Sequence, residues 1–209
     1  PVSCATALRG KERASPPFPH PLQGVPFSHR KITTVGRPLQ GCRRKGANMA
    51  KSHDHKTNAV RALDAADLAY EFRVFECGDH APSGVEVAKA LELDPDQVFK
   101  TLVTVGKTGE HYVFMIPVAE ELDLKKAARA VGEKAIAMIK SKELLPLTGY
   151  VHGGCSPIGM KKTFTTVVDE TAQLFDAIYF SAGKIGCQIR LSSEDLGKVI
   201  DLSYADLIA

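Results

Sequence analysis

The feature that most limits how this chain can fold is an abrupt change of composition near residue 48. Residues 1–48 contain seven of the twelve prolines, and nine Lys or Arg side chains against one acidic residue, a net charge of +8. Their apolar residues follow neither the 3.6-residue period of a helix nor the two-residue period of a strand. Residues 49–209 hold the other 18 basic and 23 acidic side chains, a net charge of −5. Only this second part of the chain is predicted to build a packed core.

Three interpretations of residues 1–48 are open. The Arg-rich, acid-poor composition is typical of an organelle transit peptide, although its prolines would disrupt the amphipathic helix that such peptides form. A basic arm that contacts nucleic acid would carry the same charge. We favour a third interpretation, a disordered basic extension that is not part of the native structure. The first methionine is Met49, and the sequence that follows it reads as a natural start.

Residues 56–209 have the length of a single domain. No apolar run approaches the roughly 18 residues of a membrane span, so we expect no membrane partner. Few cysteines in a chain of 209 residues argue against a disulfide scaffold and favour reduced thiols and a cytoplasmic location. The five are Cys4, Cys42, Cys77, Cys155 and Cys187.

Helix caps and alternating apolar residues predict the fold class. Thr57 can cap a first helix, and Ser83–Glu86 is a capping box that opens a second one. The runs "VFKTLVTV" and "HYVFMIPV", joined by "GKTGE", predict an antiparallel hairpin. Further strands are expected over 70–76, 134–139, 150–152, 163–168, 178–181 and 187–191, and further helices at 95–97, at 123–132, after a Ser141 cap, and near Glu194 and Ala205. This mixture predicts a single α+β domain with a mixed, mostly antiparallel sheet flanked by helices.

Two glycine-rich loops are the strongest local signal for a binding site. "GGCSPIGMKK" covers Gly153–Lys162, and "SAGKIG" covers Ser181–Gly186 after another expected strand. Glycine lets backbone N–H groups approach a ligand closely, and consecutive amides can form a nest for an anion or a carbonyl oxygen. Two wide turns without a ligand are the alternative.

Motifs for cofactors and metals are weak or absent. The chain has no glycine fingerprint for nucleotides and no nucleophile elbow. Cys77-x-x-His80 and His152-x-x-Cys155 together offer two sulfurs and two imidazoles, a set that zinc accepts. We favour small buried thiols and loop histidines instead, and expect neither a metal nor a cofactor.

Four segments resemble successive motifs of the YbaK/EbsC family. They are "DPDQVFKTLV", "PVAEELDLKKAARAVG", "TGYVHGGCSPIGMKK" and "YFSAGKIG". The resemblance covers about residues 56–209, in order, and leaves residues 1–48 without a counterpart. It implies the fold of a free-standing editing domain related to the insertion of bacterial prolyl-tRNA synthetases, and the deacylation of Cys-tRNA(Pro), with Cys-tRNA(Cys) as a further candidate.

The resemblance also implies a site. Lys100 would be the catalytic residue and would hold the 3′-terminal adenosine and its ester. The family's Gly-x-x-x-Pro loop falls on Gly153–Pro157 and would hold the aminoacyl carbonyl and amino group, as an oxyanion hole does. The implied substrate-binding residues are Phe75, Gly153, Gly154, Ser156, Pro157, Gly159, Ser181 and Gly183.

The implied mechanism uses the substrate as its own nucleophile. The candidates contain no Ser-His-Asp set and no carboxylate pair, which fits attack by the substrate's cysteine thiol on its own carbonyl. The enzyme would then be a lyase rather than a hydrolase, and would supply orientation and electrostatics. Two positions depart from the family: Phe75 stands where a tyrosine is common, and Gln188 where several members have an aspartate. Both departures affect the expected choice of substrate.

Three functions stay open at this point. The first is a deacylase of Cys-tRNA(Pro), or of another small aminoacyl-tRNA such as Ala-tRNA(Pro). The second is a non-catalytic module that binds a tRNA end or a synthetase, and the third is an unrelated small-molecule-binding domain. The net charge of −5 makes strong autonomous tRNA binding unexpected, because phosphate contacts need Lys or Arg. We therefore expect two partners, the 3′ end of aminoacylated tRNA(Pro) and prolyl-tRNA synthetase, and no binding to DNA.

Overall fold

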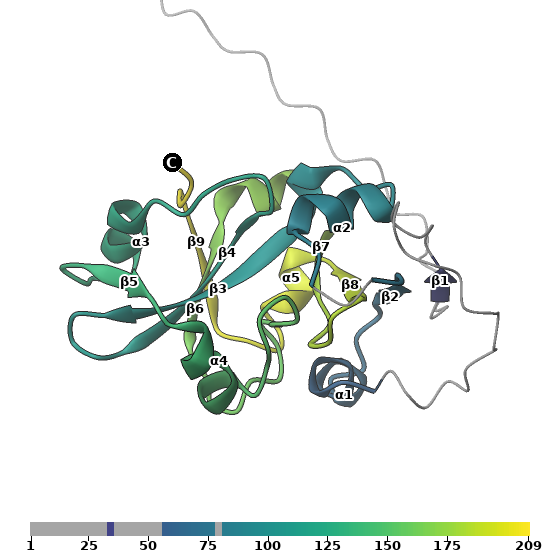
Figure 1. The fold of residues 1–209 in the computed structure, drawn as a ribbon, viewed down its shortest axis with the longest axis horizontal. Coiled ribbons are helices and arrows are strands. Elements are labelled where there is room, and N and C mark those ends of the chain that lie inside the picture. The colour runs from purple at the N-terminus through teal and green to yellow at the C-terminus, as the bar shows by residue number, and fades with distance from the viewer. Residues whose placement is uncertain (1–32, 36–55, 78–80) are drawn as a thin grey trace, which may run out of the picture.

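The computed structural model describes residues 56–77 and 81–209, together with the backbone of residues 33–35 (Figure 1). The helices are α1 (Asn58–Ala65), α2 (Gly84–Ala90), α3 (Leu124–Ala130), α4 (Ser141–Thr148) and α5 (Ser193–Leu196), with 3₁₀ turns η1 (Pro95–Gln97) and η2 (Glu170–Leu174). The strands are β1 (Thr33–Val35), β2 (Glu71–Val74), β3 (Phe99–Gly106), β4 (His111–Pro117), β5 (Ile136–Met138), β6 (Thr165–Asp169), β7 (Ile178–Ser181), β8 (Cys187–Leu191) and β9 (Leu202–Ala205).

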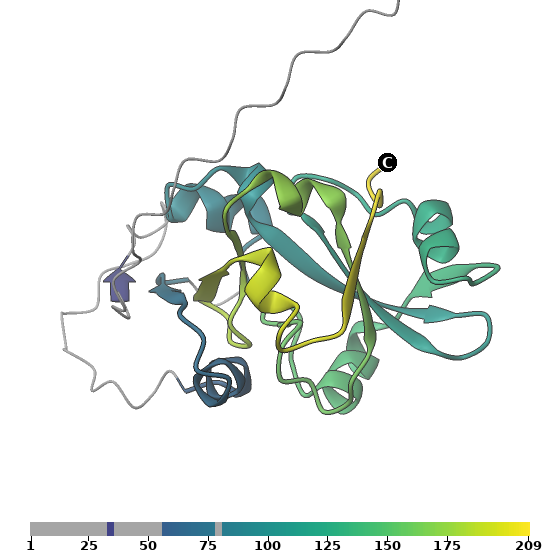
Figure 2. The same ribbon diagram turned by 180° about the vertical axis from the view of Figure 1, so that it is seen from behind.

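The described strands form two sheets rather than the single sheet expected from the sequence. One has the order β1-β2-β8-β7 and the other the order β5-β3-β4-β6-β9. The predicted hairpin is confirmed, because β3 and β4 pair antiparallel over seven positions from Phe99↔Pro117 to Val105↔His111. β6 and β9 then extend that sheet in parallel. Figures 1 and 2 show the two sheets side by side, with helices around them, so the α+β class is confirmed.

The two sheets approach each other along one edge of β3. Its other edge pairs with β4 along its length. On the approaching edge, β5 pairs only with Thr104–Gly106, and an isolated parallel bridge joins Val98 to Tyr179 of β7. Between these contacts, residues 100–102 have no ladder partner on that side among the described strands. This gap in the pairing positions the candidate site described below.

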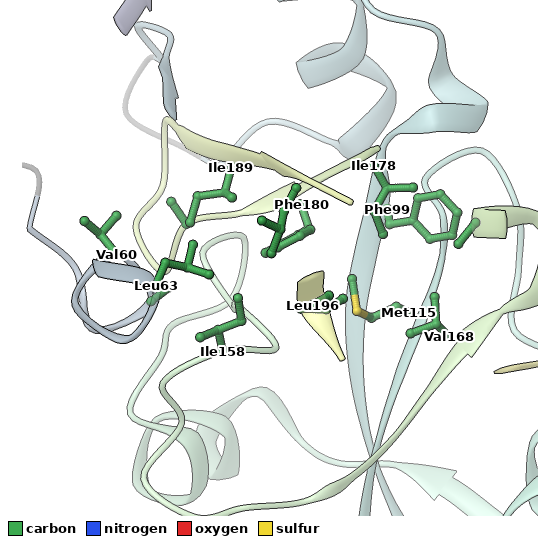
Figure 3. Packing of buried hydrophobic residues seen from close by; sticks show 14 of the residues in the cluster. Val60, Leu63, Phe99, Met115, Ile158, Val168, Ile178, Phe180, Ile189 and Leu196 are labelled. Carbon is green, nitrogen blue, oxygen red and sulfur yellow. The ribbon is translucent and has the colours of Figure 1, made fainter. Parts of the chain in front are cut away.

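A shared hydrophobic core holds the two sheets together. Side chains from both meet in it: Phe99 and Met115 come from β3 and β4, and Phe180 and Ile189 from β7 and β8 (Figure 3). Helix α1 closes the cluster with Leu63, which is fully buried. Because burial of each large apolar side chain contributes roughly 1.5–3 kcal/mol, this cluster fixes the relative position of the strands that carry the site.

Local signals set most of the helix boundaries. The hydroxyl of Thr57 accepts a hydrogen bond from the N–H of Val60, and the capping box at Ser83 is complete, as predicted. The cap of α4 was predicted wrongly. Lys140 is its N-cap and Ser141 its first helical residue. The carboxylate of Glu143 accepts a hydrogen bond from the backbone N–H of Lys140 at 3.3 Å.

Two other elements also differ from expectation. Residues 150–152 form no strand, because the Tyr150 side chain is buried and its hydroxyl donates to the carbonyl of Ile158 at 2.7 Å, which curls the chain into a loop. The expected helix near Ala205 is instead β9, which pairs with β6 from Thr166↔Leu202 to Asp169↔Ala205. Pairing with a neighbouring strand has overridden the local preference in this segment.

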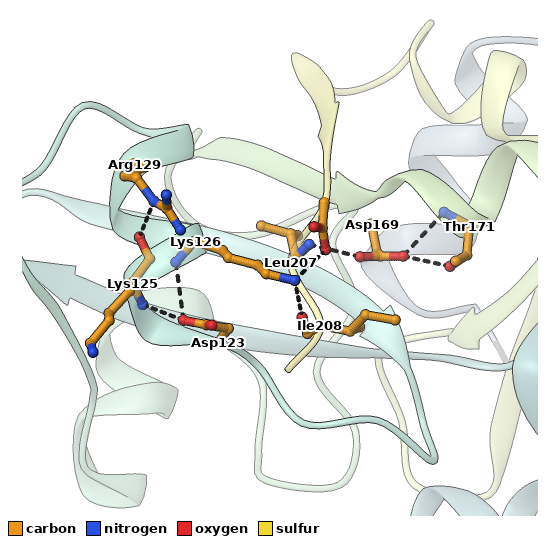
Figure 4. A network of polar contacts seen from close by, with 9 residues as sticks. Asp123, Lys125, Lys126, Arg129, Asp169, Thr171, Leu207 and Ile208 are labelled. Carbon is orange, nitrogen blue, oxygen red and sulfur yellow. Dashed lines mark hydrogen bonds and ion pairs between the residues drawn. The ribbon is translucent and has the colours of Figure 1, made fainter.

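Polar contacts anchor the C-terminal segment (Figure 4). The buried carboxylate of Asp169 accepts from the N–H of Leu207 at 2.9 Å and from the N–H and hydroxyl of Thr171. On α3, the Lys126 ammonium donates to the carbonyl of Ile208 at 2.7 Å and pairs with Asp206 at 2.9 Å. These contacts hold β9 at the sheet edge.

Three residues of the N-terminal extension take part in a sheet. β1 pairs in parallel with β2, from Thr33↔Phe72 to Val35↔Val74. The remainder of residues 1–48 lies outside the described residues, so the expectation of a disordered, non-native extension stays a prediction there. In the described part of the chain the longest helices have eight residues, where a bilayer crossing needs about 20, so none of them could span a membrane.

Candidate active site

A cavity of about 280 Å³ lies at the gap between the two sheets. The unpaired edge of β3 forms one wall, and the starts of α2 and α4 form two others. The first glycine loop, the end of β7 and the start of β8 complete it. Its polar lining comes from Ser83, Lys100, Thr101, Ser141, His152, Cys155, Ser181 and Gln188, and its apolar lining mainly from Val87, Val98, Leu102, Val103, Val118, Met138, Ile139 and Leu144. No described Asp or Glu lines it.

Strand register brings three of the polar residues to one level. The parallel bridge joins Val98 to Tyr179, so Lys100 and Ser181 both lie two residues beyond it. Ser181 is in turn the direct antiparallel partner of Gln188 on β8. Side chains two residues apart on a strand share a face. The fold therefore places a lysine, a hydroxyl and a carboxamide together from three strands.

The Lys100 ammonium forms one hydrogen bond within the described part of the chain. Its Nζ donates to the carbonyl of Val118 at 3.3 Å, a long hydrogen bond. Partial burial lowers the pKa of Lys100, and the carboxylates of Glu121 and Glu120 oppose that decrease. An ammonium that is partly desolvated and weakly held can interact strongly with a ligand oxygen. This arrangement suits a residue that binds or polarises a ligand.

The first glycine loop is bare chiefly because it packs closely against other segments. Gly153 lines the cavity at φ +80°, and a side chain there would lie 2.5 Å from the Cβ of Ala81. Gly154 does not line the cavity. Its N–H donates to the carbonyl of Val151 at 3.1 Å, and a Cβ would lie 3.0 Å from the backbone nitrogen of Ile185. Glycine is thus required at position 154 because the backbone of the second glycine loop packs closely against it.

The other predicted glycines also contact protein. Gly159, at φ +72°, lies against the backbone of Asn58 at the start of α1. Gly183, at φ +92°, lies against the ring of Tyr150. Burial raises the pKa of the Tyr150 hydroxyl to about 12. Neither glycine lines the cavity.

The remaining predicted binding residues do not line the cavity. Ser156 is fully buried, and its hydroxyl accepts from the N–H of Ile158 at 3.3 Å. Pro157 is buried beside it. Phe75 packs with Val87, which lines the cavity, in a small apolar cluster. Of the predicted site, the structure gathers Lys100, Gly153 and Ser181 at the cavity. The catalytic and substrate-binding roles of all the predicted residues stay predictions.

Sequence reasoning missed several cavity residues. Thr101 follows Lys100 directly, but nothing in a strand sequence distinguishes a threonine at an unpaired edge. His152 and Cys155 were considered as metal ligands, and both line the cavity. Burial raises the pKa of the Cys155 thiol to about 12, so it stays protonated and is a poor nucleophile at neutral pH. His80 lies outside the described residues, and those described contain no group of three His, Cys, Asp or Glu placed to hold a metal.

Comparison with known families decides the identity of this fold. The profile of the aminoacyl-tRNA editing domain matches residues 79–199, a segment that includes β3, the cavity and both glycine loops. The chain belongs to the aminoacyl-tRNA editing domain family. The resemblance to YbaK/EbsC motifs is thereby confirmed.

Relatives of this editing domain extend the match. A protein of Enterococcus faecalis, described as a candidate Cys-tRNA(Pro)/Cys-tRNA(Cys) deacylase, EbsC, is 42% identical over 157 residues, which cover 75% of this chain and 96% of the relative. A proline–tRNA ligase of Pelobacter propionicus is 33% identical over 84 residues, 40% of this chain and 15% of the ligase. The crystal structure of a candidate trans-editing enzyme for prolyl-tRNA synthetase superposes with a TM-score of 0.67 at 24% identity, covering 76% of this chain and 99% of that one.

Proposed function

We propose that this editing domain is an aminoacyl-tRNA deacylase that clears Cys-tRNA(Pro), with Cys-tRNA(Cys) as a further candidate substrate. The observation that carries the proposal is the 42% identity to EbsC over nearly the whole length of that protein. The cavity adds chemical support, since Lys100 and Gly153 of the family motifs both line it. A role in translation quality control fits a cytoplasmic protein, and so do the free thiols of the three described cysteines, Cys77, Cys155 and Cys187.

The cavity favours a reaction in which the substrate supplies the nucleophile. No described carboxylate lines it, and Cys155, the one described cysteine that does, has a pKa raised to about 12 by burial and so is protonated at neutral pH. The substrate thiol attacks the ester carbonyl, so a carbon–sulfur bond forms and the carbon–oxygen bond to the ribose breaks. The thiol proton passes to the departing ribose oxygen. The products are free tRNA and a cyclic thioester that water opens in solution. Lys100 would orient the ester and stabilise its developing negative charge.

A local basic surface beside the cavity supports tRNA as the substrate. The start of α4 lines the cavity, and the exposed Lys140 and Lys142 lie at this end of the helix. Lys161 and Lys162 are exposed too, and the Lys161 ammonium reaches the carbonyl of Leu145 at the other end of α4. None of the four forms an ion pair within the described residues. We call Lys140, Lys142, Lys161 and Lys162 the α4 lysines.

The overall charge of the editing domain limits its own affinity for tRNA. Residues 49–209 carry a net charge of −5, which opposes binding to the phosphates of tRNA. The four α4 lysines offer only a small number of phosphate contacts. We therefore propose that prolyl-tRNA synthetase acts as a partner that delivers the mischarged tRNA. Adding the synthetase should then raise the rate of deacylation at a physiological salt concentration more than at a low one.

The test is deacylation of tRNA(Pro) charged with cysteine, alanine, serine or proline. Cys-tRNA(Pro) should be cleaved much faster than Ser-tRNA(Pro). The two differ only in sulfur for oxygen, and a thiol, with a pKa of about 8.5, is the better internal nucleophile. Equal rates with cysteine and serine would refute the substrate-thiol mechanism. A preference for alanine would reassign the substrate, and no turnover with any of the four would leave a tRNA-end or synthetase-binding module.

A further inference from the structure

Two residues that line the cavity each carry a side-chain oxygen without a hydrogen-bond partner. The oxygens are Oγ1 of Thr101 and Oε1 of Gln188, and both are buried. Among the described residues, these are the buried side-chain polar atoms that no partner satisfies, and both residues line the same cavity. Gln188 is only 9% exposed. Buried polar atoms are nearly always paired, so an unpaired one calls for an explanation.

Comparable side chains elsewhere in the fold do have partners. The hydroxyl of Thr104, three residues further along β3, donates to the carbonyl of Tyr112. The hydroxyl of the buried Thr148 donates to the carbonyl of Leu144 at 2.7 Å, and the carboxamide of Gln97 donates to the carbonyl of Ala177 at 2.7 Å. The unpaired oxygens are thus a property of the cavity rather than of threonine or glutamine in this protein.

The two oxygens come from opposite sides of the seam between the sheets. Thr101 lies in the stretch of β3 that has no ladder partner on this edge. Gln188 lies on β8, directly opposite Ser181, which register places level with Lys100. Thr101, Gln188 and Lys100 all line the same cavity, so a ligand group that reaches both oxygens also lies near Lys100.

The chemistry of an aminoacyl ester indicates which group that is. The Lys100 ammonium only donates hydrogen bonds, so it suits the carbonyl and ribose oxygens, which accept them. The α-amino group, when protonated, has three N–H donors and no acceptor, which complements two neutral oxygens. We propose that Thr101 and Gln188 bind the α-amino group of the aminoacyl ester, and that the site therefore requires a free amine.

This inference rests on the proposed function, because it takes the ligand to be an aminoacyl ester. It also gives a role to Gln188, whose carboxamide carries no charge. A carboxylate at this position would attract the Lys100 ammonium as well as the substrate amine. The carboxamide oxygen still accepts from the amine and leaves Lys100 with its contact to the carbonyl of Val118. Gln188 and Thr101 are thus specificity-determining residues for substrates with an unblocked amine.

The test removes the amine from the substrate and the acceptors from the protein. 3-Mercaptopropionyl-tRNA(Pro) matches Cys-tRNA(Pro) except that hydrogen replaces the α-amino group, so its thiol is kept and no bulk is added. Single-turnover rates are divided by the uncatalysed rate of each ester, which removes differences in intrinsic reactivity. Wild-type protein should prefer the cysteinyl ester by at least about tenfold, because a site built for a donor rejects the analogue that lacks it.

The variants identify the acceptors. Gln188→Leu and Thr101→Val should each slow cleavage of the cysteinyl ester and leave the rate with the amine-free ester within about twofold. Gln188→Glu and Thr101→Ser, which keep an acceptor oxygen, should retain the preference. The matched controls are Gln97→Leu and Thr104→Val, whose side chains are paired outside the cavity. Equal loss on both esters would mean a structural role and would overturn the inference.

A binding measurement separates this inference from the proposed function. The probes are 3′-amino-3′-deoxyadenosine linked through a stable amide to cysteine or to 3-mercaptopropionic acid. Tighter binding of the cysteinyl probe to wild type, reduced in Gln188→Leu, supports the amine site even if no aminoacyl-tRNA is cleaved, and then only the deacylase proposal fails. Equal affinities of wild type for the two probes would overturn the amine site whatever the turnover.

Discussion

Replacing Lys100 with methionine should abolish most of the activity and leave the fold intact. Methionine keeps a long unbranched side chain, so it can fill the same space against the cavity wall. Within the described residues, the Lys100 side chain forms one hydrogen bond, the 3.3 Å contact with the carbonyl of Val118 at a part-buried position. A weak contact of this kind contributes less than about 1 kcal/mol, so the free energy of unfolding should change by no more than that.

The pH dependence of stability gives the sign of the change. Burial lowers the pKa of Lys100 in the folded protein below its ordinary value of 10.5, which the unfolded chain keeps. Between these two pKa values the unfolded chain binds more protons, so the stability of wild type rises with pH through that window. Below the window wild type carries the full cost of a desolvated ammonium. Lys100→Met should lack this rise and be at least as stable as wild type at neutral pH.

The expected loss of activity follows from the electrostatic role. Removing one preorganised contact to a developing negative charge typically lowers the rate about 10²- to 10³-fold, equivalent to about 2.7–4 kcal/mol of transition-state stabilisation. If the protonated ammonium is required, kcat/KM of wild type should also fall as pH rises through the lowered pKa of Lys100. The methionine variant should show a low rate without that decrease.

The assay is single-turnover cleavage of Cys-tRNA(Pro) with protein in excess, together with thermal unfolding of each variant. Lys107→Met is the matched control, because Lys107 is exposed in the turn after β3, away from the cavity. A rate for Lys100→Met within threefold of wild type would refute the site assignment. A large fall in the unfolding temperature would instead show that Lys100 supports the fold, and the electrostatic reasoning would then be wrong.

Three further predictions follow from the loops and surfaces. Gly154→Val should lower the thermal unfolding temperature as well as turnover, because its side chain would press on the backbone at Ile185; a fully stable but inactive variant would show that the loop faces ligand. Lys140→Ala combined with Lys142→Ala should lower kcat/KM for charged tRNA and reduce the slope of its salt dependence by the equivalent of about two phosphate contacts. The rate on a cysteinyl adenosine ester should not change. A chain that begins at Met49 loses only β1 among the described elements, so its unfolding temperature and turnover should stay close to those of the full chain.

Sequence reasoning succeeded where a few neighbouring residues determine the structure. The capping box at Ser83 acts within three residues and forms as predicted. Asp123 likewise caps α3, at the start of the helix expected over residues 123–132. The hairpin of β3 and β4 needs only alternating apolar residues and a short turn. Structure set by distant partners was missed. β9 becomes a strand because β6 offers it an edge, and the loop after Tyr150 depends on a hydroxyl that reaches Ile158.

The same distinction applies to the site. Lys100, Gly153 and Ser181 were identified through motifs, whereas the cavity depends on where β5 stops pairing with β3 and β7 begins. That gap is a property of two sheets and has no signature in any one segment. Thr101 becomes a candidate ligand-binding residue only because it falls in the gap. Gln188 was noticed as a departure from the family, but its unpaired oxygen appears only once β8 is placed beside β7.

The glycines of the two loops illustrate how one residue type can serve the site indirectly. Glycine was expected to leave backbone amides open to a ligand, yet the Gly154 amide already donates to the carbonyl of Val151. A side chain at Gly154 would meet the second loop, and one at Gly183 would meet Tyr150. Close approach of the two loops holds Gly153 and Ser181 at the same cavity from two distant parts of the chain. The bare backbone thus positions the wall of the site, while the side chains of Lys100, Thr101 and Gln188 supply the polar groups that a bound aminoacyl ester would meet.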